Sequence, residues 1–265
     1  MKFILLSLVC VVAASVIRPQ SKSVPSPDDK YRITPSGSGS ADDTLTVDST
    51  GNSLNKRINY GEPISDAWIV KILHSENKAM TCTASMINER FALTAAHCSD
   101  APERLLVSSA NGTIYTVMRT IDHPEYTVFS SDNLHDIALL RINGTYESEV
   151  FPSLATREYQ KGTPLIVAGF GASKIPGYNE NRKYALSTEN SIAFYNRDGK
   201  VILNEKEVVV SGQSVLSGFR KGDSGGPSFL RENGKPVLIG VHSQHDSDIS
   251  VAKYRSWIEE NIARE

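Results

Sequence analysis

The feature that most constrains the fold is a series of short apolar stretches, separated by turn residues, that begins near residue 58. These stretches are rich in Val, Ile and Leu, with Gly and Asn between them, and they occupy residues 68–73, 91–96, 113–118, 137–142, 164–170, 208–210 and 236–241. Runs of this length between turn residues are typical of β-strands. The pattern predicts an all-β body of the sandwich or barrel type.

The last segment of the chain has a different period. Tyr254, Trp257, Ile258 and Ile262 recur at helical spacing, which predicts a C-terminal helix that packs by one face onto the β body. The chain has 265 residues, of which 40% are hydrophobic, enough for one large domain or two small ones. No internal repeat of fixed period is visible.

The N-terminus has the features of a secretory signal peptide. Lys2 precedes an apolar run at residues 3–12, and small residues follow it. This order predicts a signal peptide over residues 1–15, cut after Ala14 or Ser15, although an N-terminal strand buried in the core is the alternative. The apolar run is too short to span a bilayer, and so is every later one. We therefore expect a secreted, extracellular protein without a membrane partner once the signal is removed.

Residues 16–57 form a polar leader. They are rich in Ser, Pro, Asp and Gly and end at Lys56-Arg57. Such a segment cannot bury enough apolar surface to offset the entropy of ordering it, so we expect it to be disordered. The formal net charge of the chain is -2, which gives no reason to expect a nucleic acid or a membrane surface as partner.

Cysteines and sequons carry two further expectations for a secreted chain. Of the three cysteines, Cys10 leaves with the signal peptide. Cys82 and Cys98 then remain as a pair, for which a disulfide is the default in an oxidising compartment. Asn111 and Asn143 each begin an Asn-Gly-Thr sequon, and each is either a glycosylation site or a plain turn.

The candidate nucleophile lies in the sequence Gly-Asp-Ser-Gly-Gly-Pro, residues 222–227. Three glycines and a proline around one serine favour a tight loop that holds the Ser224 hydroxyl in a fixed, exposed place. Serine alone is a weak nucleophile, so a base and an orienting acid are required elsewhere in the chain.

Two stretches offer that base and that acid. His97 ends an apolar run beside Cys98, and imidazole titrates close enough to neutrality to take and return a proton. Asp136 stands at the start of an apolar stretch, where a buried carboxylate needs a partner such as a ring N–H of histidine. Each has a structural alternative, a satisfied core histidine and a turn aspartate. The three together point to nucleophilic catalysis.

These stretches, in the order His97, Asp136, Ser224, resemble the chymotrypsin-type (trypsin-like, S1) serine proteases over about residues 58–262. Thr-Ala-Ala-His-Cys around His97 and Gly-Asp-Ser-Gly-Gly-Pro around Ser224 carry the resemblance. It implies two six-stranded antiparallel β-barrels, with the catalytic groups in the cleft between them, and a C-terminal helix.

The same resemblance implies a role for each site residue. Ser224 is the nucleophile, His97 the general base and then acid, and Asp136 the residue that orients His97. The amides of Gly222 and Ser224 form the oxyanion hole. Ser243 contacts the buried aspartate and begins the substrate-binding strand. The Gly-Phe-Gly sequence at 169–171 is similar to the Gly-Trp-Gly turn of the second barrel.

Activation is implied as well. Arg57 stands where the family cleaves its zymogen, and the freed ammonium of Ile58 then pairs with Asp223. Asn59-Tyr60 replaces the usual Val-Gly after this Ile. The leader, residues 16–57, is then a propeptide, and residues 58–265 are the protease domain. Lys56-Arg57 suits a trypsin-like or a dibasic-specific activating protease.

The specificity region departs from trypsin. Gly218 occupies the place of the aspartate with which trypsin binds Lys or Arg, and Arg220 replaces a cysteine. His242, just before Ser243, matches a histidine with which glutamyl endopeptidases bind an acidic side chain. Three interpretations stay open: His242 selects Glu or Asp, a nearby Asp246 or Asp248 selects basic residues, or His242 merely packs.

Two classes of function remain. The chain is either an active secreted serine endopeptidase or a catalytically silent protease homologue that binds a partner. The expected partners are a protein or peptide substrate, an activating protease and protein inhibitors, and the expected state is a monomer. No cofactor is expected and no metal-ligand spacing is visible, while calcium binding by a surface loop stays open.

Overall fold

The structure, a computed structural model, describes most of the chain after residue 60. The parts described are residues 61–77, 79–99, 104–108, 112–127, 134–172, 185–197, 199–210, 213–217, 219–244 and 247–265. The expected signal peptide and propeptide, the activation site at Arg57 and Ile58, the sequon at Asn111, and Gly218 lie outside these ranges. Those expectations therefore stay predictions.

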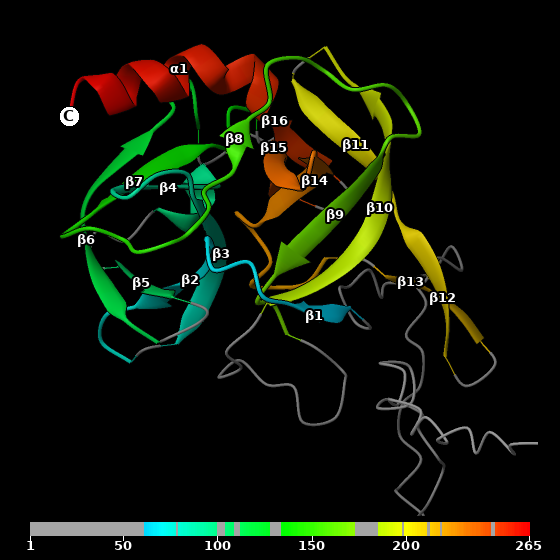
Figure 1. Ribbon diagram of the computed structural model, residues 1–265, viewed down its shortest axis with the longest axis horizontal. Helices are drawn as coiled ribbons and strands as arrows, with labels where there is room; N and C mark the ends of the chain where they lie inside the picture. Colours follow the sequence, from blue (N-terminus) through cyan, green and yellow to red (C-terminus); the bar gives the residue numbers. More distant parts are fainter. Residues whose placement is uncertain are drawn as a thin grey trace, which may run out of the picture. The chain divides into compact units, whose positions relative to one another are not determined.

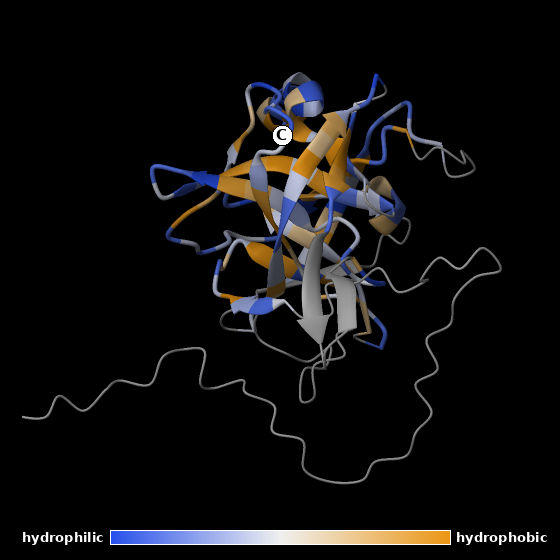
Figure 2. Ribbon diagram, turned by 90° about the vertical axis from the view of Figure 1, so that its right-hand side faces the viewer, coloured by the Kyte–Doolittle hydropathy of each residue, from blue (hydrophilic) through white to orange (hydrophobic). Residues whose placement is uncertain are grey.

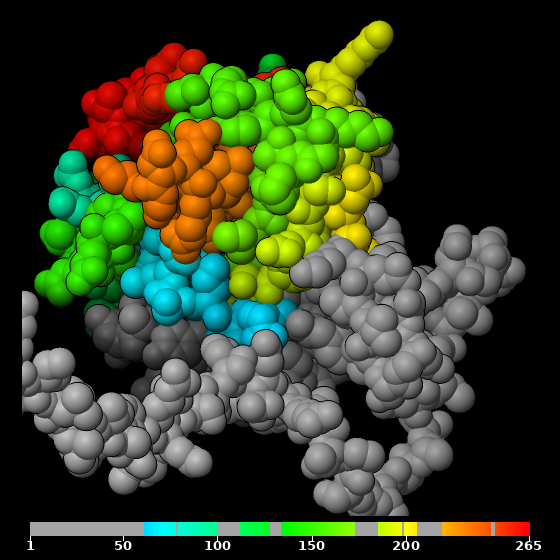
Figure 3. Space-filling model, turned by 45° about the vertical axis from the view of Figure 1, so that its right-hand side comes forward, coloured from blue at the N-terminus to red at the C-terminus, as the bar shows by residue number. Residues whose placement is uncertain are grey.

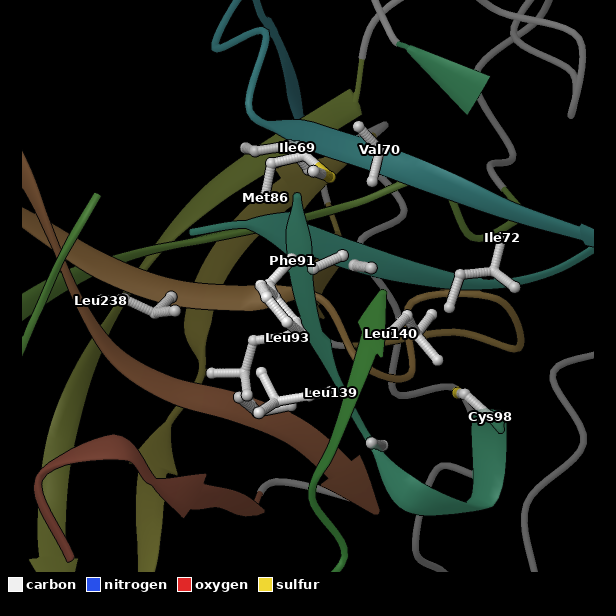
Figure 4. Packing of buried hydrophobic residues seen from close by; sticks show 14 of the residues in the cluster. Ile69, Val70, Ile72, Met86, Phe91, Leu93, Cys98, Leu139, Leu140 and Leu238 are labelled. Carbon is white, nitrogen blue, oxygen red and sulfur yellow. The ribbon is translucent and has the colours of Figure 1, made fainter. Parts of the chain in front are cut away.

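Six antiparallel strands close into a first barrel, in the order β2-β3-β4-β7-β6-β5 (Figure 1). Their bounds are β2 Ile69–His74, β3 Met80–Met86, β4 Phe91–Thr94, β5 Arg104–Ser108, β6 Ile114–Asp122 and β7 Ala138–Ile142. Phe91, Leu93 and Leu139 pack together in its interior and are fully buried (Figure 4). Burial of one such side chain contributes about 2 kcal/mol, so this cluster is a main source of the barrel's stability.

A second ring of six strands is closed by β9, which pairs with both β10 and β14. The ring continues through β11, β16 and β15. Its bounds are β9 Pro164–Gly169, β10 Ala185–Tyr195, β11 Lys200–Asn204, β14 Pro227–Glu232, β15 Lys235–Gln244 and β16 Ser247–Ser250. Two short strands pair with members of this ring. They are β1 Glu62–Ile64, which pairs with β10, and β8 Ser153–Leu154, which pairs with β15. This arrangement confirms the predicted all-β, trypsin-like fold.

The predicted C-terminal helix is confirmed as α1, Val251–Ala263. Tyr254 and Ile258 are buried, and Trp257 and Ile262 pack against the same core. The helix lies beside β8 and β15, and the space-filling view shows it (red) next to the green segment around β8 and the orange β14–β15 hairpin (Figure 3). No helix in the described ranges is long and apolar enough to cross a membrane.

Two local features differ from the sequence prediction. The apolar stretch at 91–96 is a strand only as far as Thr94, after which Ala96–Cys98 form a 3-10 helix. The stretch at 208–210 belongs to β12, Lys206–Val210, which among the described strands pairs with β13 alone, Gln213–Ser217, in a separate hairpin. Elsewhere most of the strongly hydrophobic residues lie on strands, and many of the connecting turns are hydrophilic (Figure 2). The apolar stretches therefore predicted where the strands lie in the sequence, but not which strands pair with one another.

The two barrels are joined by residues that bear directly on the site. Thr83, in β3, donates from its backbone N–H to the carbonyl of Ser224 at 2.8 Å and from its hydroxyl to the carbonyl of Gly222 at 2.8 Å. The Phe170 N–H in turn donates to the Thr83 hydroxyl at 3.0 Å. Thr83 thus ties the Ser224 loop and the Gly-Phe-Gly turn of the second barrel to the first barrel.

Candidate active site

His97 lies in the 3-10 helix that follows β4. Cys98, its neighbour, forms a disulfide with Cys82 of β3, which confirms the predicted pair. Ala96 and Cys98 are fully buried, whereas the His97 side chain is 29% exposed. The helix therefore anchors both sides of the histidine in the core and leaves its ring open to solvent.

Asp136 immediately precedes β7 and has no exposed surface. Its Oδ1 accepts the backbone N–H of His97 at 2.8 Å, and its Oδ2 accepts His97 Nδ1 at 2.8 Å and the Ser243 hydroxyl at 2.5 Å. Burial by itself raises the pKa of Asp136. The hydrogen bond and charge of His97, together with the Ser243 hydroxyl, outweigh burial and bring the pKa below its ordinary value.

An ionised Asp136 fixes the state of the histidine ring. Because a carboxylate only accepts hydrogen bonds, Nδ1 of His97 carries the proton. In a neutral ring Nε2 then has a free lone pair, which is the form that a general base requires. Three residues from three separate elements thus make one chain of hydrogen bonds, from Ser243 through Asp136 to His97.

The Ser224 loop is held by backbone hydrogen bonds on both sides. The N–H of Gly225 donates to the carbonyl of His242 at 2.7 Å, and the His242 N–H donates to the carbonyl of Gly226 at 2.8 Å. On the other side, the Ser224 carbonyl accepts the N–H of Thr83. Ser224 itself is partly exposed, so the loop presents this residue while its backbone is fixed.

Gly225 shows how closely this loop approaches the first barrel. Its φ is +78°, and a Cβ built there would lie 1.9 Å from Thr94 Oγ1 and 2.4 Å from the carbonyl oxygen of Thr83. Only glycine accepts both that backbone conformation and that contact. The residue after Ser224 therefore packs directly on Thr94, which lies three residues before His97 in the sequence.

Asp223 is buried beneath the same loop. Its carboxylate accepts the N–H of Gly171 at 2.7 Å and the N–H of Arg220 at 2.7 Å. Gly169 and Gly171 make room for it, because a Cβ at either would lie 2.3 Å or 2.5 Å from the Asp223 side chain. The Gly-Phe-Gly turn thus holds the Asp223 side chain in its buried position, a contact that the sequence did not indicate.

The specificity region holds a second pair of histidine and aspartate. His242 Nδ1 lies 3.2 Å from Asp248 Oδ1, and the His242 side chain is only 5% exposed. The ring of Phe219 stacks on that of His242 with centroids 3.4 Å apart. The pair follows from the antiparallel register of β15 and β16, which places Asp248 opposite His242. Sequence reasoning named both residues but did not join them.

Comparison with known proteins agrees with these observations. A family model described as Trypsin matches residues 58–258. Vitamin K-dependent protein C of Oryctolagus cuniculus is 28% identical over 74% of this chain, which spans only 49% of that protein. Chymotrypsin-like elastase family member 1 of Macaca fascicularis is 28% identical over 69% of this chain and 79% of its own length.

A solved structure supports the fold. Mouse neuropsin, described as a serine protease, superimposes with a TM-score of 0.60 at 20% identity, over 76% of this chain and 96% of its own. The family model covers well over half of the 265 residues. The chain therefore belongs to the trypsin family of chymotrypsin-like serine proteases.

Proposed function

We propose that this chain is a secreted serine endopeptidase, made as a zymogen, that cleaves peptide bonds through an acyl-enzyme. The observation that carries the proposal is the buried Asp136, which holds His97 Nδ1 at 2.8 Å, while the loop of Ser224 packs on Thr94, three residues before His97. Membership of a serine protease family supports the same reaction class. A silent homologue would not require an oriented histidine.

In the proposed mechanism Ser224 Oγ attacks the scissile carbonyl carbon while His97 Nε2 takes the hydroxyl proton. The imidazolium that results is stabilised by Asp136 and gives its proton to the leaving amine. The backbone N–H groups of Gly222 and Ser224 would receive the oxyanion, and each such donor typically lowers the barrier by about 3 kcal/mol. Water then hydrolyses the acyl-enzyme by the same proton transfers in reverse.

Activation is proposed to proceed by cleavage after Arg57. The new ammonium of Ile58 would insert beside Asp223, which the Gly-Phe-Gly turn already holds in a buried position. A buried ion pair of this kind organises a site because the loss of one partner leaves an uncompensated charge. Asp223 is adjacent in sequence to Gly222 and Ser224, so the pair would set the oxyanion hole.

For specificity we propose that His242 favours Glu or Asp before the scissile bond. With Nδ1 bound to Asp248, Nε2 is the nitrogen left to contact a substrate, and a protonated ring can donate from it to a carboxylate. The rival is that Asp248 binds Lys or Arg directly. That rival rests on Asp248 Oδ2, which is buried and accepts no hydrogen bond within the described residues.

The test is hydrolysis of a peptide library by the chain after cleavage at Arg57, with the uncleaved chain and Ser224→Ala as matched controls. The proposal expects turnover by the cleaved wild type alone. It expects cleavage after Glu or Asp, while cleavage after Lys or Arg would select the rival at Asp248. Equal turnover by Ser224→Ala would reject the proposal that the chain is a serine endopeptidase with Ser224 as its nucleophile.

A further inference from the structure

A second group of chemistry-bearing side chains lies outside the proposed catalytic residues. His123 and Glu125 follow β6, and His135 directly precedes Asp136. One ligand atom from each of the three residues lies within 4.8 Å of the others. Both histidines are partly buried and Glu125 is exposed. The fold thus gathers two imidazoles and a carboxylate from parts of the chain with no metal-binding sequence spacing.

The distances in this group suit a metal ion better than a direct hydrogen bond. His135 Nε2 lies 3.3 Å from Glu125 Oε2. A charge-assisted hydrogen bond between such groups is shorter, about 2.8 Å. Two ligands on a tetrahedral zinc ion, each with a bond of about 2.0 Å, are about 3.3 Å apart. The two atoms therefore already have the separation that a shared ion requires.

Tyr254 orients the ring of His135. The Tyr254 hydroxyl and His135 Nδ1 share a hydrogen bond of 2.9 Å, and Tyr254 is buried in α1. When Nδ1 donates to this oxygen, Nε2 presents its lone pair toward Glu125. Metal-ligating histidines commonly have such a partner on their other nitrogen, and it fixes both ring orientation and tautomer.

The second histidine, His123, packs against the ring of His135. The rings of His123 and His135 are stacked with centroids 4.8 Å apart. The His123 side chain is partly buried. Its Nδ1 accepts only a long bond of 3.3 Å, from the N–H of Glu125, which ligation can replace.

We propose that His123, Glu125 and His135 bind a zinc ion, with water in the fourth position. Imidazole and carboxylate ligands suit Zn²⁺, whereas Ca²⁺ and Mg²⁺ prefer oxygen ligands alone. The ion links the segment after β6 to the residue before Asp136, and through Tyr254 to α1. Zinc therefore stabilises the folded chain, independently of whether the chain is a peptidase.

The proposal is tested by titrating the full chain with ZnCl₂ in isothermal calorimetry, on a Ser224→Ala background that prevents self-digestion. We expect one ion per chain, and a loss of affinity in His123→Ala and in Glu125→Gln that is at least as large as the roughly 10- to 100-fold cost of removing a residue that only supports a ligand. Glu147→Gln, an exposed carboxylate outside the group, and His97→Ala should bind zinc as the parent does. Circular dichroism checks that each variant is folded.

Thermal unfolding provides a second test of zinc binding. Zinc at 100 times the dissociation constant of the parent should raise the melting temperature of the parent more than that of Glu125→Gln, since the stabilisation grows with the ratio of zinc concentration to dissociation constant. Cobalt substitution should give the visible absorption of a tetrahedral site in the parent alone. Undiminished affinity in both ligand variants, or loss of binding in His97→Ala, would overturn the proposal.

Discussion

The molecule contains two histidine–aspartate pairs, His97 with Asp136 and His242 with Asp248, and their environments differ. In the first, the aspartate accepts three hydrogen bonds and the histidine ring is 29% exposed. In the second, the ring is 5% exposed and stacked under an aromatic ring, and one aspartate oxygen accepts no hydrogen bond within the described residues.

The contrast shows that the surroundings, rather than the residue types, determine what such a pair can do. A base needs an oriented ring with one nitrogen accessible to a reacting proton, which the first pair provides. A buried ring with an incompletely satisfied carboxylate suits recognition of a charged group or a packing role. Four sets of substitutions test this difference, and they are described in decreasing order of their expected effect.

The largest effect is expected from Asp136→Asn. The amide can no longer hold Nδ1 protonated, so His97 adopts the wrong tautomer and kcat should fall by about 10⁴-fold. Steady-state hydrolysis of a peptide ester measures it. Asp248→Asn is the matched control, and its kcat on the same ester should stay within about threefold of wild type. Equal losses in the two variants would remove the distinction between the pairs.

The disulfide that anchors the first pair is expected to matter for stability. Cys82 and Cys98 are separated by 16 residues, and closing a loop of this size contributes roughly 3 kcal/mol. The double variant Cys82→Ala, Cys98→Ala should lower the free energy of unfolding by about that amount, as measured by urea denaturation. A change below about 0.5 kcal/mol would show that the 3-10 helix of His97 is held by packing alone.

The second pair is probed by His242→Ala and Asp248→Asn on the substrate with the preferred residue before the scissile bond. Each should reduce kcat/KM by about 30-fold, the equivalent of about 2 kcal/mol for a buried charge contact. Activity on a substrate with Ala at that position should change little in comparison. Uniform losses on both substrates would assign the second pair to packing rather than recognition.

The smallest effect is expected from Ser243→Ala. Because the folded pKa of Asp136 is depressed, its ionised form contributes stability that is present above its unfolded pKa and is lost as the pH falls through the folded value. Removal of one hydrogen bond should reduce this contribution by about 1 kcal/mol. Unfolding free energies at pH 7 and at a pH below the folded pKa of Asp136, which lies under its ordinary value of 3.8, measure it, and the difference from wild type should disappear at the acidic end.

The sequence predicted the segments of the first pair because their signals are local. The glycines around Ser224 and the apolar run before His97 are readable in short windows, and Gly225 is required by its positive φ and by its close approach to Thr94 and Thr83. The strand predicted at 91–96 ends at Thr94 because Ala96–Cys98 form a 3-10 helix, and Cys98 of that helix is bound to Cys82 of β3. Local composition cannot report such tertiary constraints.

The second pair and the proposed zinc ligands could not be located in that way. His242 meets Asp248 only through the register of β15 and β16. His123 and His135 meet because β6 and β7 pair as neighbours in the first barrel. The hydrogen bond from the N–H of Gly171 to the Asp223 carboxylate joins residues that are 52 positions apart. Each depends on strand pairing, which apolar patterns do not specify.

The most direct test of the account is to treat the chain, cleaved after Arg57, with a fluorophosphonate and to locate the adduct by mass spectrometry. The account predicts one adduct, on Ser224, formed rapidly in wild type and Asp248→Asn and at least about 10³-fold more slowly in His97→Ala and Asp136→Asn. Absence of the adduct in the cleaved wild type, or equal rates in all four proteins, would contradict it.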